Sequence, residues 1–314
     1  MILYITNAYP SKTKPDRGIF NKEQIESIKR IKGDHFVNVI SIDPPMINYV
    51  VIFFKILFMN KKNISIVHFH HGLTYVFFRV LFLRRKVFCS IQNELAFEFL
   101  GSSTILSSIL LGLFQFISIC YSDVFIFKGV AENVGAKSFS LPNGVNLKFF
   151  KKSSQKEAKQ RQGLDINSKY LLFVSSKNLK RKQKRFDLFQ KLFEDSYVKN
   201  VYKPLIATNL NRFQLKDYIN SSEIVIVTSD FEGSSNLIKE SIACSAQIVM
   251  TKVGDYYRYK NFKNISFCEK GNYKSILNKV KSHNHFEYDG HLLINKLSLS
   301  QYDVAKNLIK IYGI

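Results

Sequence analysis

The sequence predicts an α/β protein built from two doubly wound parallel sheets. Short apolar runs that are typical of buried strands alternate with helical patterns along the chain, and the alternation occurs twice. The chain has 314 residues, a length that suits about two domains, each large enough to bury its own core. A polar segment without a strand pattern covers residues 147–168. We therefore expect one domain at residues 1–150 and a second at residues 151–314.

The predicted strands are runs rich in β-branched and aromatic residues. In the first half these runs are ILYIT, VNVISI, ISIVHF, KVFCSI and VFIF. In the second half they are YLLFVS, PLIATN, EIVIVTS, AQIVMT and ISFCE. Val304, Leu308 and Ile311 recur at helical spacing in the last segment, which predicts that an amphipathic helix closes the chain.

Positive charge is in excess throughout the chain. Lys and Arg number 46 against 24 Asp and Glu, giving a formal net charge of +22, and both halves contribute. Such a charge attracts nucleic acid, anionic lipid and nucleotide phosphates alike, so it does not indicate which of them is the partner. The four cysteines are far apart and form no C-x-x-C pair, which argues against a disulfide framework or a zinc site. No secretory signal precedes the first strand, so we expect a cytoplasmic protein.

Two apolar regions are candidates for contact with a membrane. The stretch from Phe99 to Ser122 is uncharged and long enough for a span of about 20 residues. Its many Ser, Gly and Gln residues fit better with a helix that is buried on both sides or lies against lipid. The apolar run NYVVIFFKILFM is followed by Lys61 and Lys62, and more basic residues follow the next aromatic stretch. This pattern predicts a face resting on an anionic membrane, the alternative being core helices with solvated basic ends.

The loop after EIVIVTS is a candidate phosphate site, because ligands bind beyond the carboxyl ends of parallel strands. It reads DFEGSSNLIKESIAC, and a predicted helix has Ser234, Ser235 and Asn236 in its first turn. Free N–H groups and the positive end of the helix dipole favour an anion there. Glu232 and Glu240 would lie roughly 12 Å apart along the helix axis, a distance that could hold both ends of an extended ligand. An N-capped helix with two solvated glutamates is the alternative.

Three further loops after strands carry candidate residues. Six of the nine residues from Lys177 to Arg185 are basic, which suits a diphosphate, although nucleic-acid binding or a solvated loop would also fit. Gly18 precedes a helix that begins near Phe20 and lets the backbone approach a ligand. His70, after ISIVHF, is a candidate ligand-facing residue, with an exposed loop histidine as the alternative. No D-x-D pair is present, so we expect Arg, Lys and the helix end to neutralise charge without a metal.

Taken in order, these segments resemble glycosyltransferase family 4, whose members are retaining and metal-independent. EGSSNLIKE fits the E-x₇-E motif of that family and is followed by SIAC, a strand and VGD. PNGVNLKFF resembles its interdomain segment, and RKQKRFDL fits its R-x-x-K-x-F-x-L phosphate motif. The amino-terminal YPSKTKPDRGIFNKEQ and the closing LSLSQYDVAKNLIKIY complete a resemblance over nearly the whole chain. It implies the GT-B architecture, in which two Rossmann-like domains face a central cleft: an acceptor-side domain, then a nucleotide-sugar-binding domain.

The resemblance also implies roles for individual residues. Glu232 would contact the donor sugar, and Arg181 and Lys184 the pyrophosphate, so these three form the predicted catalytic group. Glu240 would bind the donor ribose, and Gly18 would line the cleft. The predicted substrate-binding residues are Gly18, His70, Ser234, Ser235, Asn236 and Glu240.

The implied activity is transfer of a sugar, with retention, from a nucleotide-diphosphate donor to a lipid-linked or saccharide acceptor. A UDP-sugar is the family-level expectation for the donor, with no metal, no cofactor and no nucleic-acid partner. Bacterial surface polysaccharide assembly at the inner face of the plasma membrane is the expected setting. The chain departs from the family at Gln92, where many members have histidine, and at Asn146, where they have aspartate. A catalytically silent partner of another transferase and a basic nucleic-acid-binding protein remain alternatives.

Overall fold

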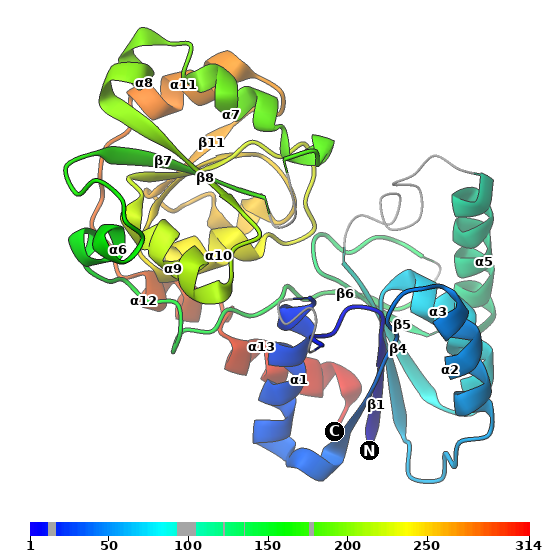
Figure 1. The fold of residues 1–314 in the computed structure, drawn as a ribbon. Helices are drawn as coiled ribbons and strands as arrows, with labels where there is room; N and C mark the ends of the chain where they lie inside the picture. Colours follow the sequence, from blue (N-terminus) through cyan, green and yellow to red (C-terminus); the bar gives the residue numbers. More distant parts are fainter. Residues whose placement is uncertain (12–16, 93–104, 122, 135, 176–178) are drawn as a thin grey trace. The chain divides into compact units, whose positions relative to one another are not determined.

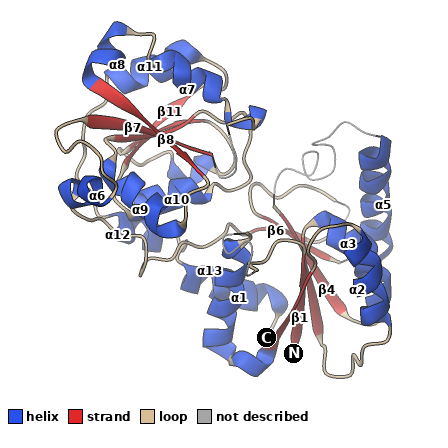
Figure 2. Cartoon of the chain, in the orientation of Figure 1, coloured by secondary structure: helices blue, strands red, loops and turns tan. Residues whose placement is uncertain are grey.

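The computed structural model describes residues 1–314 except 12–16, 93–104, 122, 135 and 176–178. It divides into two units (Figure 1): Met1–Gly144 with Gln301–Ile314, and Val145–Ser300. Each unit holds one sheet flanked by helices (Figure 2). Every pairing between described strands is parallel, which confirms the predicted fold class.

The predicted domain limits, 1–150 and 151–314, differ from these units at both ends. Val145 and Phe150 belong to the core of the second unit, where Val145 also pairs with Ser300. The polar segment 147–168, expected to be the boundary, lies within the second unit and contains a helix. The last helix packs in the first unit, because its apolar side is buried against the first sheet.

The first unit has a six-stranded sheet in the order β2-β1-β3-β4-β5-β6. The strands are β1 (Ile2–Thr6), β2 (Val37–Ser41), β3 (Ile66–His70), β4 (Lys86–Ile91), β5 (Val124–Phe127) and β6 (Ser138–Ser140). The first five match the predicted runs. The edge strand β6 was not predicted, because its three half-exposed residues are too few to show a pattern.

Two layers of helices cover this sheet. One face packs against α1 (Ile19–Lys32) and α13 (Gln301–Tyr312), which also contact each other. The other face packs against α2 (Ile47–Leu57), α3 (Gly72–Phe78) and α5 (Ile105–Tyr121). Short 3₁₀ turns, η1 (Asp34–Phe36) and η2 (Arg79–Phe82), complete the described helices of this unit. Among the described helices, none is long and apolar enough to cross a membrane.

A buried polar cluster joins α13 to the sheet. The Tyr312 hydroxyl lies 2.5 Å from the Tyr4 hydroxyl and also bonds to Nδ1 of His68. Nε2 of His68 lies 2.8 Å from Oγ of Ser90. Burial holds the pKa of His68 well below its usual value, helped by the nearby His70 and Lys128. The neutral imidazole can therefore act as donor on one nitrogen and acceptor on the other.

The second unit has a five-stranded sheet in the order β11-β10-β9-β7-β8. The strands are β7 (Lys169–Ser175), β8 (Tyr202–Thr208), β9 (Ile224–Val227), β10 (Gln247–Thr251) and β11 (Ile265–Cys268), and all five match predicted runs. One face is covered by α9 (Arg212–Ser221), α10 (Asn236–Ala243) and α12 (Gly290–Lys296), with α6 (Gln155–Arg161) packed on α9. The other is covered by α7 (Phe186–Leu192), α8 (Ser196–Val201) and α11 (Tyr273–Lys281). Two 3₁₀ turns, η3 (Lys182–Lys184) and η4 (Tyr256–Tyr259), lie in loops after β7 and β10.

Candidate functional site

Three loops meet at the carboxyl edge of the second sheet. They follow β7, β9 and β10, which are neighbours in that sheet, so parallel pairing brings their ends together. Oγ1 of Thr228, after β9, donates to the carbonyl of Lys184 at 2.6 Å. Oγ1 of Thr251, at the end of β10, donates to the carbonyl of Ser229 at 2.5 Å. The loop after β9 is thus fixed on both sides.

Lys184 and Glu232 are in direct contact at this edge. Nζ of Lys184 lies 2.5 Å from Oε1 of Glu232, and Oγ of Ser229 donates to the same oxygen at 2.8 Å. About 15% of each side chain remains exposed, so both are within reach of a ligand. The resemblance implies that Lys184 contacts the donor pyrophosphate and Glu232 the donor sugar. In the structure the two side chains form an ion pair with each other. An anionic ligand can replace Glu232 as the acceptor for Lys184.

The loop after β10 lies directly on the Glu232 loop. Gly254 has φ +58°, and a Cβ at this position would lie 2.4 Å from the carbonyl oxygen of Gly233. Only glycine allows this approach without strain. The following Asp255 accepts a hydrogen bond from Oγ of Ser234 at 2.8 Å. The VGD segment that follows the E-x₇-E motif in sequence therefore supports it in space.

Lys239 is buried beneath these loops. Its side chain, on α10, is fully buried, and Nζ donates to Oγ of Ser234 at 2.6 Å. Burial lowers the pKa of Lys239 to about 8, although the nearby Asp255 and Glu240 favour its charged form. Sequence reasoning did not single out this residue. The available signal was a lysine beside Glu240 in an otherwise uncharged helix.

Glu240 pairs with an arginine that the sequence analysis did not identify. Glu240 is 4% exposed, and its Oε1 accepts a hydrogen bond from the guanidinium of Arg212, the first residue of α9. That guanidinium also stacks on Phe150, with its carbon 4.6 Å from the ring centroid. A charged pair with this little exposure keeps a defined geometry.

The helix after β9 begins later than predicted. Asn236 is the first residue of α10 and Ser235 its N-cap, so Glu232 and Ser234 precede the helix. The predicted separation of roughly 12 Å along one axis is therefore wrong, because only the four steps from Asn236 to Glu240 are helical and they rise roughly 6 Å. The side chain of Ser235 makes no capping hydrogen bond, and Oδ1 of Asn236 has no partner among the described residues. Both groups lie at the start of α10, a few positions after Glu232 in the sequence.

Arg181 precedes the 3₁₀ turn that presents Lys184. Its carbonyl accepts the backbone N–H of Lys184 at 2.9 Å, and its side chain is half-buried. Lys177, the first residue of the predicted basic run, lies outside the described residues. The described part of the run thus holds Arg181 and Lys184 one turn apart on the same short segment.

Gly18 and His70 belong to the first unit. Gly18 has φ +61°, and a Cβ there would lie 2.1 Å from the carbonyl oxygen of Ala8, so α1 begins against the loop after β1. His70 ends β3 and is 1% exposed, which overturns the alternative of an exposed loop histidine. Burial and the nearby Lys128 hold the pKa of His70 well below its usual value. Neither ring nitrogen of His70 has a hydrogen-bond partner within the described residues.

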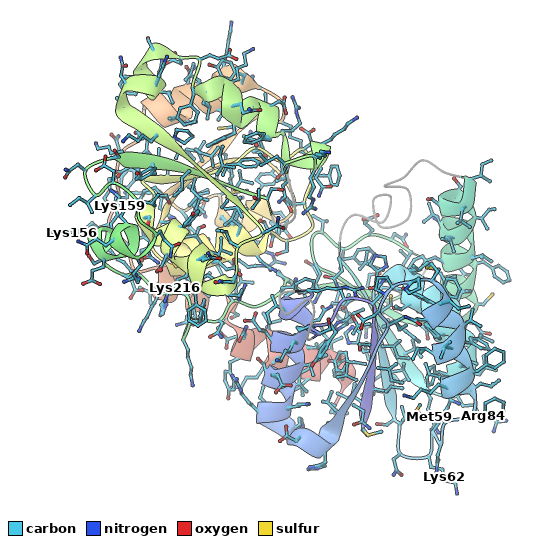
Figure 3. All side chains as sticks on the ribbon, viewed as in Figure 1. Met59, Lys62, Arg84, Lys156, Lys159 and Lys216 are labelled. Atoms are coloured by element: carbon cyan, nitrogen blue, oxygen red, sulfur yellow. The ribbon has the colours of Figure 1, made fainter. Side chains whose placement is uncertain are left out.

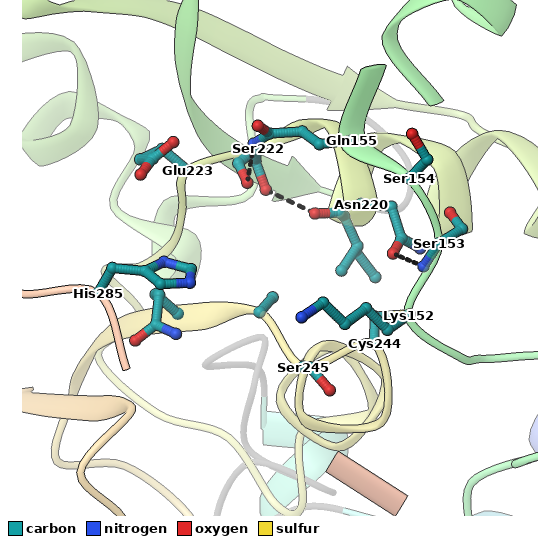
Figure 4. Close-up of a pocket in the computed structure, with 13 residues that line it drawn as sticks. Lys152, Ser153, Ser154, Gln155, Asn220, Ser222, Glu223, Cys244, Ser245 and His285 are labelled. Atoms are coloured by element: carbon teal, nitrogen blue, oxygen red, sulfur yellow. Dashed lines mark hydrogen bonds between the residues drawn. The ribbon is translucent and has the colours of Figure 1, made fainter. Parts of the chain in front are cut away.

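A cavity of about 720 Å³ lies elsewhere in the second unit (Figure 4). Its lining includes Glu223 and Gln247, at the amino ends of β9 and β10, together with Lys152 and His285. It is thus at the opposite edge of the sheet from Lys184 and Glu232, and none of the predicted site residues lines it. Among the described residues, no group of three or more His, Cys, Asp or Glu side chains could hold a metal ion.

Comparison with known proteins identifies the fold. No protein-family model matches the chain, and no curated protein matches its sequence. Its structure is similar to sucrose-phosphate synthase from Thermosynechococcus elongatus, with TM-score 0.74, 10% identity and coverage of 100% of this chain and 98% of that one. It is also similar to HepE from Anabaena in complex with UDP and glucose, with TM-score 0.72, 13% identity and 99% of both chains covered. A glycosyltransferase from Rickettsia africae gives TM-score 0.67 at 14% identity, covering 99% of this chain and 97% of that one. These likenesses over the whole chain show that it has the GT-B fold of glycosyltransferases.

Proposed function

We propose that this protein is a retaining glycosyltransferase of family 4 type that uses a nucleotide-sugar donor. The observation that supports it most directly is the contact between Lys184 and Glu232 at the carboxyl edge of the second sheet, where the Glu232 loop leads into the first turn of α10. The similar structure of HepE holds UDP and glucose, which supports a UDP-sugar as the donor. The proposed acceptor is a lipid-linked or saccharide hydroxyl.

The proposed chemistry needs no carboxylate nucleophile. The bond between the anomeric carbon and the donor phosphate breaks while the acceptor oxygen attacks from the same face, and the leaving phosphate takes the acceptor proton. Arg181, Lys184 and the N–H groups at the start of α10 stabilise the negative charge that develops on the phosphate. Glu232 holds the sugar and Glu240 the ribose. The donor is proposed to bind without a metal ion.

The proposed setting is assembly of bacterial surface polysaccharides, in the cytoplasm at the inner face of the plasma membrane. The positive charge of the chain supports this setting, because nucleotide sugars and the anionic phospholipids of bacterial membranes both carry negative charge.

Donor binding tests the proposal directly. The purified protein is heated with UDP-, GDP- and ADP-sugars, and one of these is expected to raise the melting temperature, because a ligand that binds only the folded state stabilises it. Lys184→Ala should weaken binding of that donor about 10- to 100-fold, the value of one charge-assisted hydrogen bond. Lys182→Ala is the matched control, since Lys182 lies on the same turn and is exposed.

Transfer is then measured with the stabilising donor and a membrane extract as acceptor, and the anomeric configuration of the product is determined by NMR. Retention of configuration is expected. Donor binding without turnover would favour the silent-partner alternative suggested by Gln92. Tight, salt-dependent binding of DNA or RNA with no response to any nucleotide sugar would refute the proposal.

A further inference from the structure

The helix layer formed by α2, α3 and α5 exposes much apolar surface to solvent. In the first unit α3 lies between the other two and contacts both. Soluble monomers seldom expose contiguous apolar patches larger than a few hundred Å², and larger ones mark interaction sites. The outer sides of α2 and α5 are therefore a candidate interaction surface.

Helix α5 is apolar around most of its circumference. It contains no charged residue over Ile105–Tyr121, and only Ser107, Phe114 and Ser118 are fully buried. Ile105 is 83% exposed and Phe116 is 67% exposed. Of the two sequence-based alternatives for this stretch, a helix buried on both sides is therefore wrong for the described residues 105–121.

Helix α2 adds a second apolar face. Its outward side carries Ile47, Val50, Val51, Phe54 and Leu57, which recur at helical spacing and are each more than 40% exposed. Phe58, directly after the helix, is 83% exposed. The inward side is held in place by Tyr49 and Ile56, which belong to the core. The exposed face thus belongs to a helix that is anchored in the core of the unit.

Basic residues border this apolar surface. Between positions 44 and 93 the chain has seven Lys and Arg residues and no Asp or Glu. Arg79 is not part of the border, because it is buried against Asp123. The turns at 58–62 and 82–85 are joined by a hydrogen bond of 2.9 Å from Arg85 to the carbonyl of Lys61. Figure 3 shows Lys62 and Arg84 extending from these turns beside Met59.

We propose that this apolar and basic surface, formed by α2, α5 and the turns at 58–62 and 82–85, binds a bilayer that contains anionic phospholipid. Side chains such as Phe58 and Phe116 enter the region between headgroups and acyl chains, while Lys55, Lys62 and Arg84 meet lipid phosphates. A second copy of the chain fits less well, because the same surface would bring like charges together with no acidic residue to pair them.

Vesicle co-sedimentation tests this inference. The full chain, without any nucleotide sugar, is mixed with vesicles of phosphatidylcholine alone or of phosphatidylcholine with phosphatidylglycerol. Binding to the anionic vesicles only, weakening as salt is raised, is expected. The double variant Lys62→Gln, Arg84→Gln should bind about 25-fold more weakly, since each basic residue near the surface contributes about fivefold. Phe58→Gln with Phe116→Gln should lose about tenfold or more.

A control variant changes one exposed apolar residue and one exposed basic residue outside the surface. Leu292→Gln with Lys270→Gln, both exposed in the second unit, should bind vesicles like the unaltered protein. Equal binding by all variants, or no binding to anionic vesicles, would overturn the inference. So would sedimentation velocity showing a dimer that only the Phe58 and Phe116 changes dissociate, because the surface would then be a protein interface. The assay contains no donor, so its outcome is independent of whether the protein transfers sugar.

Discussion

At the scale of single residues, the buried Lys239 makes stability depend on pH. Its pKa is lowered from 10.5 to about 8 by burial, so between these values the folded protein binds fewer protons than the unfolded chain. The free energy of unfolding should therefore rise with pH across this window, by about 1.4 kcal/mol per unit of pKa difference. Below pH 8 the lysine is charged in both states, and this contribution is constant.

Urea unfolding at pH values on both sides of 8 measures this effect. The unaltered protein should gain stability with pH relative to Lys239→Met, which cannot titrate at this position. The exposed Lys270→Met is the control and should follow the unaltered protein. Parallel curves for the unaltered protein and Lys239→Met would show that Lys239 keeps an ordinary pKa in the fold.

Motif residues could be predicted from the sequence, but their partners could not. Lys184 and Glu232 come from separate motifs, and the structure brings them together. Arg212 lies 28 positions before Glu240 and belongs to no recognisable pattern, so only the packing of α9 against the sheet reveals the pair. Asp255 meets Ser234 for the same reason, because this contact joins the loops after two neighbouring strands. Lys239 lies only five positions after Ser234, but its contact depends on how the loop folds back over the first turns of α10.

At the scale of elements, Gly254 links the loops after β9 and β10. Gly254→Ala should destabilise the second unit by more than the about 1–2 kcal/mol of a left-handed alanine, because its Cβ would also displace the Gly233 carbonyl. The displaced loop carries Glu232, so the donor-induced rise in melting temperature should fall as well.

Gly163→Ala separates the backbone strain of a left-handed alanine from the collision of its Cβ with a neighbouring carbonyl. Gly163 has φ +66° and no atom within 4 Å of the Cβ position, so this variant has the backbone strain without the collision. Chemical denaturation and thermal shift with the donor are measured for both variants. Equal losses of stability, with donor response retained in both, would mean that the close approach at Gly254 has no consequence for the site.

Elements were predicted where their local pattern was strong. Ten strands appear where apolar runs indicated them, whereas β6 has only three residues and depends on its neighbour β5. The start of α10 was placed too early, since Ser234 looks like a first-turn residue in sequence but is bonded to Asp255 and Lys239. Such tertiary contacts override local preference.

At the scale of the whole molecule, Tyr312 joins the last helix to the first sheet through buried hydrogen bonds. Tyr312→Phe would leave the Tyr4 hydroxyl and Nδ1 of His68 buried without this partner, at a cost of about 1–3 kcal/mol. The exposed Tyr302→Phe on the same helix is the control and should change stability little. The free energy of unfolding is measured in urea. A loss in Tyr302→Phe as large as that in Tyr312→Phe would contradict this role.

The division into units could not be predicted from composition. Residues 147–168 are polar and resemble a linker, yet Phe150 is buried and α6 packs on α9. The amphipathic pattern of residues 301–312 correctly indicated a helix but not which sheet it covers. Hydrophobic spacing specifies that a face must be buried, and the identity of the burying surface depends on the complete fold.

The return of α13 to the first sheet also determines the order in which the units can be completed during synthesis. Residues 145–300 form a continuous stretch, so the second unit has all its parts once they have left the ribosome. The first unit emerges earlier but must wait, with the side of its sheet near Tyr4 and His68 uncovered, until residues 301–312 arrive. The unit whose translation begins first is therefore the last to have all its parts.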